Sequence, residues 1–205
     1  MPKIDREERL RVLKATDEPF LSQGFVVAGI DEVGRGPLVG DVVTACVAMP
    51  ATSHLLWVDD SKKLSEKRRE ALYEQIMAEA LYVGIGRASA QVIDEINILQ
   101  ATKKAMREAA AQVPADVFLV DAVTGLGLNG TEIAIIHGDA SSYAIAAASI
   151  VAKVTRDRQM IELDKRYPGY GFAKNKGYGT PEHVAALKAL GPCPEHRRSF
   201  LRNIL

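Results

Sequence analysis

The chain has 205 residues, of which 47% are hydrophobic and 25% are charged. This length and composition are typical of one globular domain and exclude wholesale disorder. The sequence has no apolar run long enough to span a membrane and no signal-peptide pattern, and Cys46 and Cys193 lack the spacing of a disulfide framework or a zinc site. We therefore expect a cytoplasmic protein.

Basic and acidic residues are equal in number, with 26 of each, but they are unevenly distributed. Residues 153–205 contain 11 Lys or Arg against 5 Asp or Glu, whereas residues 1–152 contain 15 against 21. A basic end on an acidic body is typical of a protein that contacts phosphates with one part and holds metal ions with another. Two solvated faces of different composition would look the same.

The first half of the chain alternates between strand and helix patterns. A short polar helix is predicted over 3–15, within a lead-in that extends to about Gly24. Continuous apolar runs predict buried strands over 25–30 and 42–49, and their close succession indicates an antiparallel pair. A helix is expected over 65–80 with Ser65 as its N-cap, followed by a third strand over 81–88.

The second half continues this alternation, which predicts an α/β domain. The expected elements are helical spacing from Ser89 and again from Asn97 to Gln112, strands over 117–121 and 133–136, a long helix over 143–167, a loop over 169–180, and a helix opened by Thr180 and Pro181. The end of the chain resembles a helical appendage more than a separate domain.

Four acidic residues lie where predicted strands end: Asp31, Glu32, Asp121 and Asp139. Such residues gather at one edge of an α/β sheet, and carboxylates are preferred ligands of Mg²⁺ and Mn²⁺. A cluster without cations would raise its own pKa values, and two ions make a phosphoryl-transfer site. Asp31 and Glu32 are adjacent, so they share a site only if the pleat is broken, which the following glycines would permit. The alternative is that all four are turn or capping residues.

Several loops carry residues suited to phosphates and sugars. Gly34-Arg35-Gly36 lets backbone approach a ligand closely, and Arg35 can pair with a phosphate. Tyr178 offers a ring that stacks on a sugar or base, next to the cations of the same loop. The 59–64 loop and His196-Arg197-Arg198 add further cations. Gly34-Arg35-Gly36 alone is typical of a turn, and the alternative for each of the other segments is a solvated charged loop, which is favoured for the 59–64 loop taken alone.

Together these residues resemble bacterial ribonuclease HII. The matching segments are GIDEVGRGPL (29–38), DSKKLS (60–65), AAASIVAKVTRDR (146–158), KGYGT (176–180) and HRRSF (196–200), in family order. The resemblance implies a ribonuclease H-like α/β fold, with a mixed central β-sheet flanked by helices. We expect a lead-in over 1–24, a catalytic domain over 25–167, and a C-terminal helical substrate-binding region over 168–205 packed on the same domain.

The resemblance also implies a metal-dependent endoribonuclease. It would hydrolyse the RNA strand of RNA–DNA hybrids and cut 5′ of single ribonucleotides in duplex DNA, as in ribonucleotide excision repair, leaving 3′-hydroxyl and 5′-phosphate ends. Two Mn²⁺ or Mg²⁺ ions would be held by the four acids named above. The substrate-binding residues that we expect are Gly34, Arg35, Gly36, Ser61, Lys62, Lys176, Tyr178 and Arg197. The glycine loop would read the 2′-hydroxyl, and Tyr178 would stack on the ribose.

The chain departs from the family pattern in one loop, because Asp121-Ala122-Val123 stands where bacterial members carry Asp-Gly-Asn. The acid is kept, so activity is expected. Asp157 is interpreted as a helix-surface partner of arginines, and His54, His137 and His183 as surface or packing residues. We expect a monomer without a membrane partner, and a contact with a replication clamp is left open.

Three other functions are compatible with parts of this pattern. Ribonuclease HIII is similar, but its extra N-terminal domain and its glutamate at the fourth acidic position do not match the short lead-in and Asp139. A transposase or junction resolvase of the same fold would cut all-DNA substrates. A hybrid-binding module would bind in a salt-sensitive way without cleavage.

Overall fold

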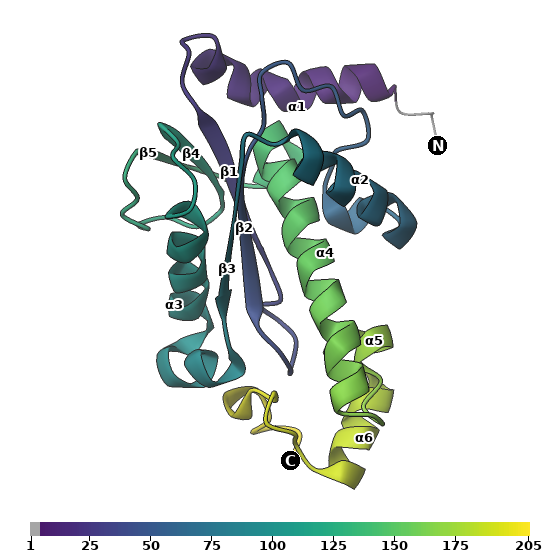
Figure 1. Ribbon diagram of the computed structural model, residues 1–205. Helices are drawn as coiled ribbons and strands as arrows, with labels where there is room; N and C mark the ends of the chain where they lie inside the picture. The colour runs from purple at the N-terminus through teal and green to yellow at the C-terminus, as the bar shows by residue number, and fades with distance from the viewer. Residues whose placement is uncertain (1–4) are drawn as a thin grey trace.

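A five-stranded mixed sheet forms the centre of the computed structural model, which describes residues 5–205 (Figure 1). The strands are β1 (Val27–Val33), β2 (Val42–Ala48), β3 (Tyr82–Ala88), β4 (Val117–Asp121) and β5 (Thr131–Ile135). Their order is β3-β2-β1-β4-β5. The β1–β2 and β2–β3 pairs are antiparallel, and the β1–β4 and β4–β5 pairs are parallel. The predicted mixed sheet and the predicted antiparallel first pair are both confirmed.

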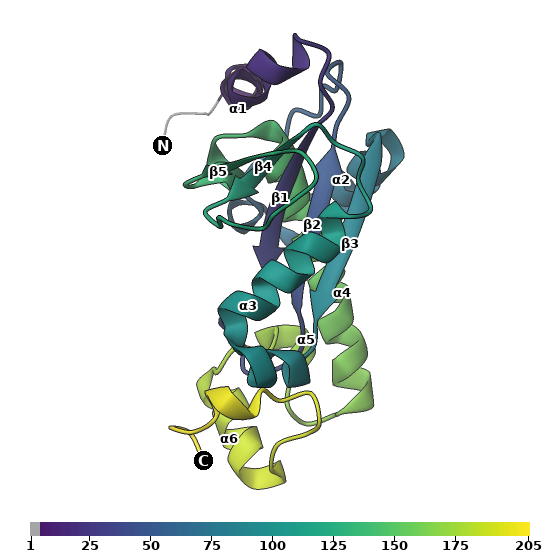
Figure 2. The same cartoon turned by 90° about the vertical axis from the view of Figure 1, so that its left-hand side faces the viewer.

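Helices cover both faces of the sheet, as Figures 1 and 2 show. The long helix α4 (Tyr143–Arg166) lies on one face beside α2 (Glu66–Glu79), and α3 (Ala90–Ala110) lies on the other. Helix α1 (Arg6–Leu21) crosses one end of the sheet. The short helices α5 (Phe172–Asn175) and α6 (Pro181–Leu190) lie with the C-terminus at the opposite end.

The start of α4 packs directly against β1, and a glycine makes this contact possible. A Cβ atom on Gly29 would lie 2.1 Å from the backbone carbon of Ala144, closer than any real contact. The first half of α4 is made largely of small residues, and its buried positions form one apolar cluster with residues of β2. This close approach places the N-terminus of α4 beside the strand that carries Asp31 and Glu32.

Several predicted boundaries differ from the structure. Helix α1 begins at Arg6 after the Asp5 cap and continues to Leu21, well beyond the predicted end, while residues 3 and 4 lie outside the described part of the chain. Strand β1 continues to Val33, because its pairing with β2 extends through the two acids. Strand β5 begins at Thr131 instead of Ile133.

Other differences concern the interiors of elements. Asn97 has a φ of 67° within α3, so the two predicted helical stretches join at a kink. Its side-chain oxygen accepts hydrogen bonds from the backbone N–H groups of Leu99 and Gln100, which starts the second stretch. The predicted loop over 169–180 contains the one-turn helix α5.

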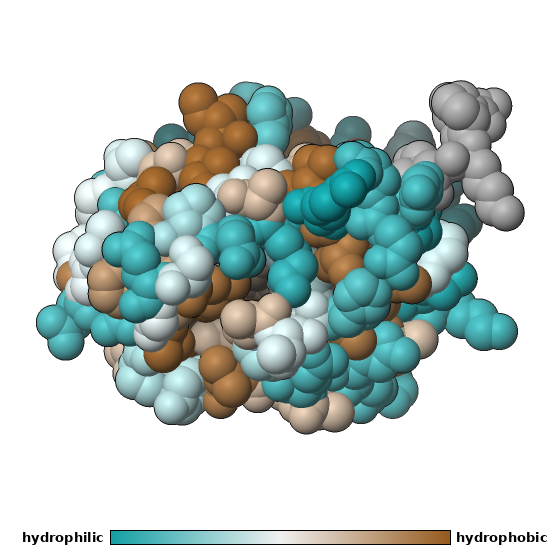
Figure 3. All heavy atoms as spheres, turned by 90° about the horizontal axis from the view of Figure 1, so that it is seen from above, coloured by the Kyte–Doolittle hydropathy of each residue, from teal (hydrophilic) through white to brown (hydrophobic). Residues whose placement is uncertain are grey.

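The described helices include none that is long and apolar enough to cross a membrane. Figure 3 looks onto the end of the molecule where α1 lies, and there hydrophilic and hydrophobic residues are interspersed over the surface. Both cysteines, Cys46 and Cys193, are free and buried.

Candidate active site

Asp31, Asp121 and Asp139 converge at one edge of the sheet. Each offers a carboxylate oxygen, and these oxygens all lie within 4.8 Å of one another. Asp31 comes from β1, Asp121 ends the neighbouring parallel strand β4, and Asp139 lies in a turn after β5 (Gly138–Ala140). The Gly138 N–H donates to Oδ1 of Asp121 at 2.7 Å, which holds this turn against β4. The structure therefore brings together three of the four acids predicted as metal ligands.

The fourth acid, Glu32, lies outside this triad but lines the same small cavity as Asp31. The cavity has a volume of about 120 Å³, and its lining also includes Ser61, Lys62, Lys153 and Tyr178. The expectation of a broken pleat is wrong, because Asp31 pairs with Ala45 and Glu32 with Thr44 in one continuous register. The two acids reach the cavity from an unbroken strand.

Burial and mutual repulsion raise the pKa of several of these acids. Burial raises the pKa of Asp31 well above its ordinary value, and the charges of Glu32 and Asp121 raise it further. Burial likewise raises the pKa of Asp121, partly offset by the hydrogen bond from Gly138. For Glu32, burial raises the pKa, and Arg35, whose Nη1 lies 3.4 Å from Oε1, opposes that shift.

This donor set fits a divalent cation. Buried carboxylates that repel one another are stabilised by a hard cation, and carboxylate oxygens are its preferred ligands. The Oε2 atom of Glu32 is buried and has no hydrogen-bond partner, so it is available as a further ligand. Asp139 forms an ion pair with Lys62, whose Nζ lies 3.6 Å from Oδ2. The Lys62 side chain is largely exposed.

The predicted substrate loops lie beside this centre. A Cβ atom on Gly36 would be 3.6 Å from the ring of Tyr178, so the glycine loop and the tyrosine are neighbours. Tyr178 is 48% exposed and also lines the acidic cavity. Ser61 is buried but reaches the cavity, where its hydroxyl accepts a hydrogen bond from Ser149 at 2.9 Å. Lys176 is half-buried at the end of α5.

Arg197 does not fit the predicted role of a direct substrate ligand. Its side chain is 0% exposed, and its guanidinium donates to the carbonyl oxygens of Gly34, Arg35, Pro37 and Gly40. A phosphate in solvent cannot reach it, so the prediction is corrected. Arg197 stabilises the glycine loop through hydrogen bonds to its carbonyl oxygens. In the HRRSF segment, His196 is also buried, while Arg198 is exposed.

A second buried arginine was missed by the sequence analysis. Arg156 is 0% exposed and donates to the carbonyl oxygens of Val39, Asp41 and Lys176, so it joins the glycine loop to the Tyr178 loop. A signal for it exists in the sequence. It occupies the apolar stripe of α4, and the stripe residues at helical spacing around it are Ala152, Met160 and Leu163.

Two further contacts near the site differ from expectation or were not foreseen. Asp157 is buried, not a helix-surface residue, and its Oδ1 accepts from Lys153 at 2.5 Å. Arg69 approaches its other oxygen to 3.7 Å, so Asp157 does pair with an arginine as expected.

On α1, the guanidinium of Arg9 donates to both carboxylate oxygens of Asp59 and to the carbonyl of Ala140, beside Asp139.

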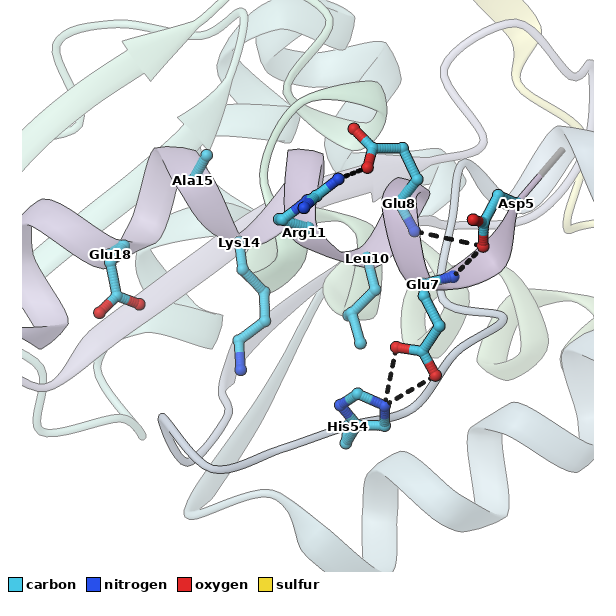
Figure 4. Close-up of a pocket in the computed structure, with 9 residues that line it drawn as sticks. All are labelled: Asp5, Glu7, Glu8, Leu10, Arg11, Lys14, Ala15, Glu18 and His54. Carbon is cyan, nitrogen blue, oxygen red and sulfur yellow. Dashed lines mark hydrogen bonds and ion pairs between the residues drawn. The ribbon is translucent and has the colours of Figure 1, made fainter.

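A larger hollow, of about 710 Å³, lies along α1 and the loop that carries His54 (Figure 4). It is lined by charged side chains of that helix and by His54, which pairs with Glu7 at 3.1 Å. His54 is exposed, as expected, and His183 is buried, as a packing residue would be. The hollow contains none of the acids of the triad, so the smaller cavity beside Asp31 is the better candidate for chemistry.

Comparisons with known proteins show the family of this chain. The family model for ribonuclease HII matches residues 28–203. The ribonuclease HII of Lachnoclostridium phytofermentans is 57% identical over 198 residues, which cover 96% of this chain and 78% of that protein. The ribonuclease HII of Geobacter metallireducens is 56% identical over 180 residues, covering 86% of this chain and 84% of that protein.

Solved structures show the same fold. The ribonuclease H2 of Pyrococcus horikoshii superimposes with a TM-score of 0.75 at 28% identity, covering 87% of this chain and 96% of that one. The ribonuclease HII of Archaeoglobus fulgidus, solved in complex with PCNA, has a TM-score of 0.72 at 30% identity, with 83% and 92% covered. This chain thus belongs to the ribonuclease HII family of metal-dependent endoribonucleases, which hydrolyse RNA in RNA–DNA hybrids.

Proposed function

We propose that this enzyme also cuts duplex DNA on the 5′ side of a single embedded ribonucleotide, by two-metal-ion hydrolysis that leaves a 3′-hydroxyl and a 5′-phosphate. The observation that carries the proposal is the position of Tyr178. Its exposed ring lies beside Gly36 and lines the cavity of Asp31 and Glu32. The side chain that we propose to contact one ribose and two of the acids that we propose to hold metal therefore line one cavity.

The acids would hold the ions: Asp31, Glu32, Asp121 and Asp139. When bound, two divalent ions supply an activated water and neutralise the charge that develops on the leaving 3′-oxygen. Whether Mn²⁺ or Mg²⁺ is used, the protein's part is to place these carboxylates. It does so on two adjacent parallel strands and on the turn that Gly138 fastens to Asp121.

The glycine loop and Tyr178 would supply the recognition of RNA at the cut site. With no Cβ atoms at Gly34 and Gly36, the backbone of this loop can approach a 2′-hydroxyl closely, and an aromatic ring stacks on the sugar. The side chain of Arg35 is 46% exposed and can reach a phosphate. We propose that Ser61, Lys62 and Lys176 bind phosphates of the nucleic-acid strand that is cut.

The C-terminal region 168–205 would form the substrate-binding part, packed on the catalytic residues 25–167. It contributes Tyr178 and Lys176, and it carries Arg197, which holds the glycine loop through a buried guanidinium. On this division of the chain, α1 belongs to the lead-in, and its Arg9 donates to Asp59 and to the carbonyl of Ala140 beside Asp139.

The test is cleavage of a labelled DNA duplex with one internal ribonucleotide, assayed with Mg²⁺, with Mn²⁺ and with a chelator. A long RNA–DNA hybrid and an all-DNA duplex of the same sequence are the controls. We expect a cut immediately 5′ of the ribonucleotide that needs metal, and no cut in the all-DNA duplex. Asp121→Asn should lower the rate on both RNA-containing substrates by about a thousandfold or more.

Other outcomes would lead to different conclusions. Cleavage of the hybrid alone would leave the family activity in place and overturn the proposal for single ribonucleotides. Cutting of the all-DNA duplex would mean that Gly34, Gly36 and Tyr178 do not select RNA. Salt-sensitive binding without cleavage under either metal would indicate a binding module.

A further inference from the structure

Two buried histidines lie in the C-terminal region, outside the acidic centre. His183 on α6 is 0% exposed, His196 in the HRRSF segment is 2% exposed, and their Nε2 atoms are 3.2 Å apart. Within residues 5–205, the group of three ligand-type side chains spaced for a metal ion is the aspartate triad, and neither histidine belongs to it. The pair is therefore separate from the acidic centre.

Backbone groups at both ends fix the direction of the hydrogen bonds. The N–H of Cys193 donates to Nδ1 of His196 at 3.0 Å, so in the neutral ring the proton is on Nε2. That Nε2–H donates to Nε2 of His183, which leaves the His183 proton on Nδ1. This last N–H donates to the carbonyl oxygen of Tyr178 at 2.8 Å. Only one order of protons satisfies the whole chain from Cys193 to Tyr178.

The surroundings keep both rings neutral, as this order requires. Tyr170 and Phe172 stack on each other and pack against both imidazoles. Burial lowers the pKa of His183, and burial together with the neighbouring His183 lowers the pKa of His196 to about 4. A second proton would also place two N–H groups against each other across the 3.2 Å contact.

Both ends of this chain of hydrogen bonds are attached to substrate loops. The segment around His196 pairs with the short segment between the glycine loop and β2, through an isolated bridge between Val39 and His196 and through Gly40 N–H to the carbonyl of Glu195 at 2.9 Å. The other end is the carbonyl of Tyr178, whose ring lies beside Gly36. The histidines thus connect the segment that directly follows the glycine loop to Tyr178, and both belong to the part of the chain that the proposed function assigns to RNA recognition.

We propose that His183 and His196 are positioning residues for substrate recognition. The two neutral rings form a chain of hydrogen bonds, all donated in one direction, that holds Tyr178 beside the glycine loop. This inference deepens the proposed function and rests on it, because it requires Tyr178 to contact substrate. It locates the effect in substrate binding and not in hydrolysis, since neither histidine contacts an acid of the triad. The effect is moderate, because the Tyr178 carbonyl also accepts from the N–H of Thr180 at 2.8 Å.

A matched pair of variants separates this role from packing. In His183→Asn the amide nitrogen takes the place of Nδ1, so the donor to Tyr178 is kept. In His183→Gln the amide takes the place of Nε2, so that donor is lost while contact with His196 is retained. On the single-ribonucleotide duplex we expect His183→Gln to raise KM about three- to tenfold with kcat within about twofold. His183→Asn, which keeps the donor to Tyr178 and loses only the contact with His196, should raise KM less.

Equal KM values in the two variants, or a loss confined to kcat, would overturn the proposal. A direct measurement on the wild-type protein keeps it testable if either variant fails to fold. Long-range ¹⁵N–¹H correlations of the imidazole rings should show the proton on Nδ1 for His183 and on Nε2 for His196 at neutral pH. The reverse tautomers, or a charged ring, would contradict the proposed direction of these hydrogen bonds. Because this measurement needs no substrate, it is independent of the outcome of the cleavage test.

Discussion

The buried guanidinium of Arg197 donates a hydrogen bond of 2.6 Å to the carbonyl oxygen of Gly34, across 163 residues of sequence. The same group makes four further hydrogen bonds to carbonyl oxygens of residues 35–40. No carboxylate lies within ion-pair distance of Arg197 in the described part of the chain. The shape of the glycine loop therefore depends on a guanidinium that is buried from solvent.

Replacing this guanidinium should disturb both stability and recognition. Arg197→Lys leaves a compact ammonium that cannot satisfy all of these carbonyl groups, so buried acceptors lose their partners. We expect the free energy of unfolding to fall by about 2–3 kcal/mol in urea titrations, and KM to rise more than kcat falls. The neighbouring exposed Arg198 is the control, and Arg198→Lys should change the free energy of unfolding by less than about 0.5 kcal/mol. Equal effects at the two positions would contradict the role assigned to Arg197.

A second prediction concerns the loop after Asp121, where Ala122 has a φ of 49°. This left-handed conformation costs an L-residue about 1–2 kcal/mol, more than the extra entropy that glycine loses on folding. Ala122→Gly should therefore raise the free energy of unfolding by about 0.5–1 kcal/mol, measured with chelator present so that metal binding does not contribute. Ala111, with a φ of −62°, is the matched control, and Ala111→Gly should lower stability. Destabilisation by both changes would mean that Ala122 is not strained.

The features that the sequence predicted well are those set by short stretches of chain. The caps Ser65 and Thr180 were foreseen, because their side chains accept from N–H groups three residues later. The aspartates of the triad were foreseen as candidates, because strand ends in a parallel sheet lie at one edge. Asp31 and Glu32 were predicted to follow the end of the first strand, whereas β1 continues through both residues.

The features that were missed depend on contacts between distant parts of the chain. Arg156 and Arg197 look like surface cations in the sequence, and what buries them is a set of backbone carbonyls more than a hundred residues away, apart from that of Lys176. Backbone carbonyl groups are the same in every residue, so no sequence pattern marks them as partners. Asp157 was placed on the surface for the same reason, because Arg69 lies on another helix.

The contact between Arg9 and Asp59 makes a third prediction, about the helix that precedes the family motifs. Arg9 donates to Asp59 at 3.0 Å and to the carbonyl of Ala140 at 3.0 Å, so α1 joins the 59–64 loop to the turn that carries Asp139. Arg9→Met would leave the buried carboxylate of Asp59 with the Asp60 N–H and the longer contact to Arg6, at 3.7 Å, as its remaining partners. We expect a loss of about 2 kcal/mol in the free energy of unfolding. It should also weaken Mn²⁺ binding in calorimetry, because the turn at Asp139 loses a support.

Two comparisons check this assignment. Arg11 lies on the exposed side of the same helix, with 76% of its side chain exposed, so Arg11→Met should leave stability and Mn²⁺ affinity nearly unchanged. In a double-mutant cycle, the loss from Arg9→Met should shrink when Asp59 is already Asn. Additive losses in the cycle would show that Arg9 acts through some other contact.

Asp17 makes the last prediction, a dependence of stability on pH. It lies 2% exposed on α1, where it accepts from the Ser142 hydroxyl at 2.7 Å and from the Ala144 N–H at 2.8 Å, at the start of α4. Burial raises its pKa from 3.8 to about 6, against the effect of these hydrogen bonds. Asn at this position can donate to the Ser142 oxygen while still accepting from Ala144, so Asp17→Asn should fold.

The direction of the effect follows from where the proton is held. Between pH 4 and 6 the folded state keeps a proton on Asp17 that the unfolded state has released, so this group's contribution to stability falls as the pH rises and is constant above about 7. The free energy of unfolding of Asp17→Asn minus that of the wild type should therefore increase by up to about 3 kcal/mol from pH 4 to 7. Urea titrations at several pH values measure this difference, in which the shifts of the aspartate triad cancel. A difference that instead decreases with rising pH would mean that the hydrogen bonds to Asp17 outweigh its burial.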